Sequence, residues 1–87
     1  MIERHYENPN KVYVKVEALF FPDGRLEPVA FWWENSRRYS IDRVLEVCRA
    51  ASLKAGGIGI RYTCVVRGHQ TYLFFEEDRW FMERRTG

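Results

Sequence analysis

Long runs of alternating apolar and polar residues, separated by short turn-forming segments, constrain this chain most. From Lys11 to Phe20 every second residue is apolar: Val12, Val14, Val16, Ala18 and Phe20. A repeat of two is typical of a β-strand with one buried face, because successive side chains of a strand point to opposite sides. The sequence therefore predicts antiparallel β-structure built from hairpins.

The segment Phe21–Arg25 (sequence FPDGR) predicts the first hairpin turn. Its proline presets φ, and its glycine accepts the left-handed conformation that such turns require. If Phe21 pairs with Arg25, counting places Val16 opposite Ala30 on the buried face. Pro28 has no N–H for a central strand, so a sheet edge or a β-bulge is expected there. A bulge would reverse the facing of the side chains beyond it.

A second turn is predicted at Glu34–Arg37, which would place Trp33 beside Arg38 as a cation–π pair. The segment near residues 41–50 then fits two structures. Its apolar residues match the stripe of a short helix, with Ser40 as the N-cap, and they also continue the parity of a strand. The strand needs no additional packing layer and is preferred. A helix at 41–50, which would make the fold α+β, stays open.

Residues 58–66 alternate again, and Gly68-His69 predicts a two-residue hairpin turn that places Arg61 opposite Glu76. Glu77-Asp78 predicts one more turn. The chain is thus expected to form two three-stranded meanders joined by a hinge at residues 49–57. Their apolar faces would cover each other in a small six-stranded antiparallel barrel or sandwich of the SH3-like or OB-like kind.

The length of 87 residues and the 46% hydrophobic content fit a single domain, 1–87, with a loose lead-in at 1–10 and a frayed tail at 84–87. The two cysteines are too few for a disulfide framework, and their spacing matches no metal site. No apolar run reaches the ~20 residues that span a bilayer. We therefore expect a cytoplasmic protein without a metal, a cofactor or membrane attachment.

Positive charge is concentrated in the middle of the chain, although the net charge is only +2. Residues 37–67 carry seven basic side chains against two acidic ones. The glycine-rich stretch from Ala50 to Cys64 lies within this segment, but it lacks the spacing of a phosphate-binding loop. We interpret this stretch mainly as a segment that connects two strands. Lys54 and Arg61 could also hold an anion beside its backbone amides.

Aromatic and basic side chains supply the best candidate for function. Small β-barrels bind single-stranded nucleic acid by stacking bases on aromatic rings between basic groups. The candidate binding residues are Tyr13, Lys15, Phe31, Trp33, Arg38, Lys54 and Arg61. The alternative is a module that docks another protein or a second copy of itself. The sequence favours neither partner decisively and does not define the oligomeric state. No set of residues completes a known catalytic site, so an enzyme is the least supported hypothesis.

Several segments also resemble a family of small uncharacterised bacterial proteins. They are Arg38–Leu45 (RYSIDRVL), Ala50–Gly57 (AASLKAGG), Arg61–Thr63 and Trp80-Phe81. The resemblance covers roughly residues 11–83. It implies a bacterial cytosolic protein and transfers no catalytic residue.

Overall fold

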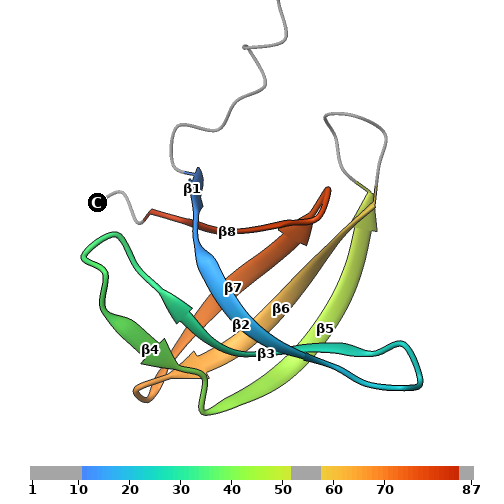
Figure 1. Ribbon diagram of the computed structural model, residues 1–87, viewed down its shortest axis with the longest axis horizontal. Helices are drawn as coiled ribbons and strands as arrows, with labels where there is room; N and C mark the ends of the chain where they lie inside the picture. The colour runs from blue at the N-terminus through green and yellow to red at the C-terminus, as the bar shows by residue number, and fades with distance from the viewer. Residues whose placement is uncertain (1–10, 52–57, 85–87) are drawn as a thin grey trace, which may run out of the picture.

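The computed structural model describes residues 11–51 and 58–84, which form eight β-strands (Figure 1). No helix that could cross a membrane lies among them. The strands are β1 (Lys11–Tyr13), β2 (Lys15–Phe20), β3 (Leu26–Trp32), β4 (Arg38–Ser40), β5 (Arg43–Ala51), β6 (Ile58–Val66), β7 (His69–Glu76) and β8 (Arg79–Glu83).

All strand pairs are antiparallel, and they form two sheets. One sheet has the order β1-β8-β7-β6-β5 and the other β2-β3-β4. The fold is therefore mostly β, as predicted. A helix at residues 41–50 is wrong, because Arg43–Ala51 is a strand paired with β6.

Two of the six long strands expected from the sequence bend and so contribute to both sheets. The first bends at Val14, whose N–H donates to the carbonyl of Trp80 at 3.1 Å. The other bends at Ile41-Asp42, where the Ile41 N–H donates to Val29 in one sheet and the Asp42 N–H to Val65 in the other. The result is eight strands in two linked sheets, instead of the six strands predicted for a barrel or sandwich, and the strands do not form a closed barrel.

The predicted hinge between two meanders is also wrong. Ala51 pairs with Ile58 within the five-stranded sheet, so the strands on either side of residues 52–57 are hydrogen-bonded neighbours. The chain passes between the sheets at its two bends instead.

The first hairpin turn is confirmed, and so is the bulge expected near Pro28. The N–H of Phe21 donates to the carbonyl of Arg25 at 2.8 Å. Across the bulge, Glu17 pairs with Ala30 but Ala18 pairs with Pro28, so the register moves by one residue. Beyond it, Val16 lies opposite Phe31 rather than Ala30. Because of this shift, the side chain of Phe31 points into the core.

The hairpin between β6 and β7 turns one residue earlier than predicted. Val66 pairs with His69, so the turn residues are Arg67 and Gly68, both with positive φ (53° and 82°). Positive φ at both positions defines a type I′ turn. Arg61 consequently lies opposite Phe74, and its predicted pairing with Glu76 is wrong. Because the register shift is even, every side chain keeps its expected face.

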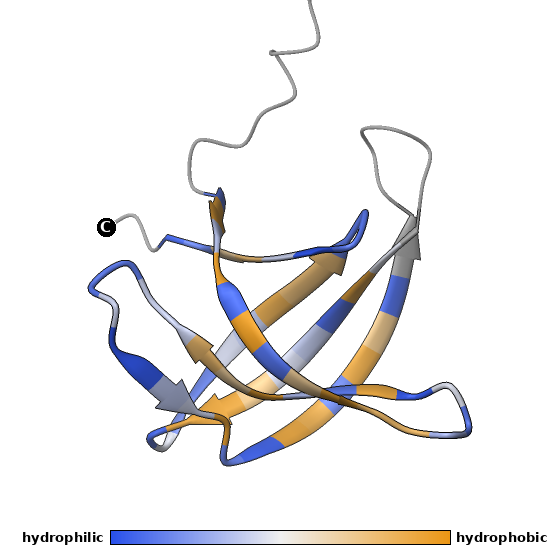
Figure 2. Cartoon of the chain, in the orientation of Figure 1, coloured by the Kyte–Doolittle hydropathy of each residue, from blue (hydrophilic) through white to orange (hydrophobic). Residues whose placement is uncertain are grey.

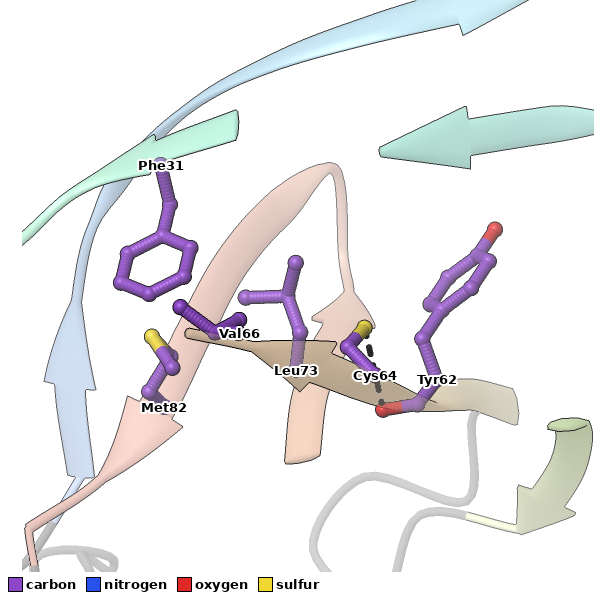
Figure 3. Close-up of a cluster of buried hydrophobic side chains, with 6 residues drawn as sticks. All are labelled: Phe31, Tyr62, Cys64, Val66, Leu73 and Met82. Carbon is purple, nitrogen blue, oxygen red and sulfur yellow. Dashed lines mark hydrogen bonds between the residues drawn. The ribbon is translucent and has the colours of Figure 1, made fainter. Parts of the chain in front are cut away.

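The core lies between the two sheets (Figure 3). Phe31 enters it from β3, and the other buried side chains come from the five-stranded sheet: Tyr62, Cys64, Val66, Leu73 and Met82. Along β5, polar and apolar bands still alternate (Figure 2). Phe20 departs from its expected buried position and is 77% exposed, because the β2–β3 hairpin projects beyond the facing sheet (Figure 1).

Candidate aromatic and basic binding surface

The structure does not bring the predicted binding residues onto one surface. Phe31 is only 5% exposed, and Trp33 is partly buried against the core. The remaining described candidates divide between the outer faces of the two sheets. Lys54, and with it the predicted anion site, lies outside the described residues.

Lys15 and Arg38 lie on the outer face of the three-stranded sheet, where they flank Trp32. Lys15 Nζ is 4.8 Å and Arg38 Cζ 5.7 Å from the centroid of the Trp32 ring. The expected partner, Trp33, is wrong by one residue, because Trp32 is the residue that pairs with Arg38. Arg38 also donates to Glu17 at 2.9 Å. This group therefore already carries an internal ion pair.

The outer face of the five-stranded sheet carries a larger aromatic cluster, made by Tyr13, Tyr72, Phe74 and Phe81, which we call the outer aromatic face. The register places Tyr13 opposite Phe81, and Phe81 opposite Phe74. The rings of Phe74 and Phe81 are stacked at 4.9 Å, with 10° between their planes. Tyr13 meets Phe81 edge-on at 5.9 Å, and Tyr72 lies 6.4 Å from Phe74. Tyr13 and Tyr72 remain 46% and 43% exposed.

Three cations lie over these rings. Arg79 Cζ is 3.6 Å from the centroid of Tyr13, Lys11 Nζ 4.4 Å from that of Phe81, and Arg61 Cζ 5.1 Å from that of Tyr72. Stacking on an aromatic face holds a guanidinium while leaving its edge donors free for an anion.

Among residues 11–51 and 58–84, no acidic side chain forms an ion pair with Arg61 or Arg79. In the part of the chain that the structure describes, neither Arg61 nor Arg79 has a carboxylate oxygen within 4.0 Å, whereas Lys11 lies at that distance from Glu76. Arg61 Nε is buried and has no hydrogen-bond partner among the described residues. A buried donor without a partner is costly.

Phe31 and Trp33 contribute to a second feature, an open pocket of about 350 Å³ between the β3–β4 and β6–β7 hairpins. Its apolar lining is Phe31, Trp33, Tyr39, Val66 and Met82, and its polar lining is Arg67, His69, Gln70, Thr71 and Glu83.

The described cysteines and acids form no recognisable catalytic or metal centre. Burial raises the pKa of the Cys64 thiol to about 11, so this side chain is a protonated thiol at neutral pH. No group of three His, Cys, Asp or Glu side chains that could hold a metal ion occurs among residues 11–51 and 58–84.

Comparison of the chain with protein-family models, with curated proteins and with solved structures gave no match. The resemblance to a bacterial family therefore stays a prediction, and the function has to be inferred from the chemistry of the surface.

The sequence contained a signal for most of the outer aromatic face. Tyr72, Phe74 and Phe81 alternate with side chains predicted to be buried, so strand parity alone places them outward. The missing information was the pairing of β1 with β8, which brings Tyr13 to Phe81. Counting residues from a turn gives the pairing of the two strands that the turn connects, so it could not pair the first strand with the last.

Proposed function

We propose that the protein is a non-catalytic binding module that holds single-stranded nucleic acid on its outer aromatic face. The observation that carries this proposal is the combination of exposed Tyr13 and Tyr72 with Arg79 and Arg61, which lie over their rings. The base of a nucleotide can stack on an aromatic ring, and its phosphate can accept hydrogen bonds from an arginine beside that ring. The surface therefore offers a partner for both parts of a nucleotide.

Stacking supplies most of the affinity in this mechanism. Each base stacked on an aromatic ring contributes about 1–3 kcal/mol. The charge contribution is local, since the whole chain carries only +2. Two or three phosphate contacts with Arg61, Arg79 and Lys11 would give a salt slope of about −1.4 to −2.1 for log K against log salt concentration.

The direct test is a titration of fluorescently labelled single-stranded oligonucleotides at low and moderate salt. We expect Tyr72→Ala to weaken binding by roughly 5- to 150-fold, the equivalent of one lost stack. Arg79→Gln should reduce the magnitude of the salt slope by about 0.7.

Arg25→Gln is the matched control for the arginine variant. Arg25 is also stacked on a ring, that of Phe21 at 4.3 Å, but it lies in the β2–β3 turn, away from the outer aromatic face. If both arginine variants lost affinity equally, the loss would reflect the change in net charge and not a specific contact of Arg79. Absence of binding at low salt would refute the proposal.

A second candidate, docking of a protein partner or of a second copy, is favoured by the apolar tip of the β2–β3 hairpin. Leu19 and Phe20 are 51% and 77% exposed there, and exposed apolar groups of this kind often mark interfaces. Sedimentation separates the two candidates, because an apolar association is insensitive to salt and depends on Phe20 rather than on Tyr72.

We also retain two expectations from the sequence, that the protein is bacterial and cytoplasmic and that its fold is related to small SH3-like or OB-like barrels. The two bent strands support the second, since strands shared between sheets are a feature of such small β-folds.

A further inference from the structure

We propose that the pocket between the β3–β4 and β6–β7 hairpins receives one base of the bound strand, with an adjoining phosphate held by Arg67. This inference rests on the proposed nucleic-acid function and extends it from the outer aromatic face to a defined nucleotide site.

The apolar part of the pocket suits a flat ring. Phe31 and Tyr39 lie opposite each other on β3 and β4, and their rings are stacked at 5.5 Å with 24° between planes. Trp33 adds a third aromatic side chain, and Val66 and Met82 close the apolar lining. A volume of about 350 Å³ lies at the lower end of the range for small-ligand sites, which fits a base and its sugar better than a larger ligand.

The polar part of the pocket suits the edge of a base. Gln70 and Thr71 both line the pocket. They are consecutive residues of β7, so their side chains point to opposite faces of the sheet, and the Thr71 side chain is on the core-facing side with Leu73. The Thr71 hydroxyl can donate and accept hydrogen bonds. Bases of a single strand are read through such bonds to their exposed edges, while the ring is stacked on aromatics. These groups favour a heteroaromatic ring over a hydrocarbon.

Arg67 supplies the charge for the phosphate. It is exposed in the turn between β6 and β7, and no carboxylate oxygen of residues 11–51 or 58–84 lies within 4.0 Å of it. The type I′ turn fixes its backbone, so its position relative to His69 and the pocket is set by the hairpin.

The pocket and the outer aromatic face both use residues of β7. Gln70 and Tyr72 are on the same side of the sheet, because they pair with Val65 and Thr63, which are also two residues apart. Two residues of a strand span about 7 Å. Thr71, between them, points to the opposite side with Leu73, toward the core and the apolar lining of the pocket. A strand that stacks one base on Tyr72 would therefore pass the β6–β7 hairpin, where Arg67 lies, to place a neighbouring base in the pocket.

The test uses nucleoside 5′-monophosphates as the probe and amide and indole NMR shifts of the full chain as the readout. We expect saturable shifts at Trp33, Gln70 and Thr71. Arg67→Asn should weaken binding at least fivefold, and it preserves the fold because Asn-Gly is the preferred pair for a type I′ turn.

Tyr72→Ala is the matched control, since it should weaken oligonucleotide binding and leave the monophosphate shifts in the pocket unchanged. If oligonucleotides bind but the monophosphates leave Trp33 and Thr71 unshifted, or shift Tyr13 and Tyr72 instead, the pocket proposal is overturned and the proposed function stands. If the pocket binds monophosphates but no oligonucleotide binds, the proposed function fails and the pocket stands as a mononucleotide site.

Discussion

Cys64 is the residue at which burial has the clearest chemical consequence. It has no exposed surface, and burial raises the pKa of its thiol from 9.0 to about 11. The unfolded chain therefore loses this proton near pH 9, while the folded protein keeps it until about pH 11. The stabilisation is complete below pH 9 and is lost as the pH rises towards 11, at up to about 1.4 kcal/mol per pH unit.

We therefore expect the free energy of unfolding, measured by urea titration, to fall between pH 9 and pH 11. Cys64→Ala is the comparison, since it lowers the stability at every pH but should flatten this fall. The pKa of Tyr62 is also raised, mainly by burial, so part of the fall should persist in the variant. Identical slopes for both proteins would show that Cys64 does not contribute.

At the scale of the elements, the two hairpins of the three-stranded sheet use one turn geometry with different residues. The N–H of Gly24 donates to Phe21, and the N–H of Ser36 donates to Trp33, each closing an equivalent turn. The φ angle at these positions is 92° and 64°. Glycine accepts this left-handed region without strain, whereas serine does not.

Ser36→Gly should therefore stabilise the protein by roughly 0.5–1 kcal/mol, read from the midpoint of thermal or urea unfolding. The reciprocal change, Gly24→Ser, should destabilise it by a similar amount. A Cβ at Gly24 would meet no atom within 4 Å, so this effect is one of backbone conformation alone. A loss of stability in Ser36→Gly would contradict the argument.

The same elements show how far strand patterns can be interpreted. Alternation predicted the strands and the turn at Phe21–Arg25, because both depend on neighbouring residues. The bulge near Pro28 was expected, but its effect on facing could not be fixed from the sequence, and Phe31 went to the core instead of the surface. In the β6–β7 turn, Gly68 is the second turn residue rather than the first, and both arrangements are common for glycine.

At the scale of the whole molecule, contacts distant in sequence assemble the candidate site. Tyr13 reaches Phe81 only because the first strand bends at Val14 and pairs with the last strand. Strand alternation cannot reveal such a bend, since the pattern continues through it. The sequence therefore predicted the type of surface, aromatic and basic, but grouped residues that the fold separates.

A single hydrogen bond offers a test of how the two sheets are held together. The hydroxyl of Tyr62, on β6, donates to the carbonyl of Leu26, on β3, at 2.6 Å. Tyr62→Phe keeps the ring in the core but leaves this carbonyl without that donor. We expect it to lower the free energy of unfolding by about 1–3 kcal/mol.

Tyr72→Phe is the matched control, because it removes the same hydroxyl from an exposed ring on the outer aromatic face and should change stability by less than ~0.5 kcal/mol. Urea unfolding of the two variants under identical conditions measures the difference. If Tyr62→Phe costs no more than Tyr72→Phe, the sheets are held by apolar packing and by the bent strands alone. A selective loss would instead mean that this bond fixes β3 against β6, and with it the shape of the core beneath the outer aromatic face.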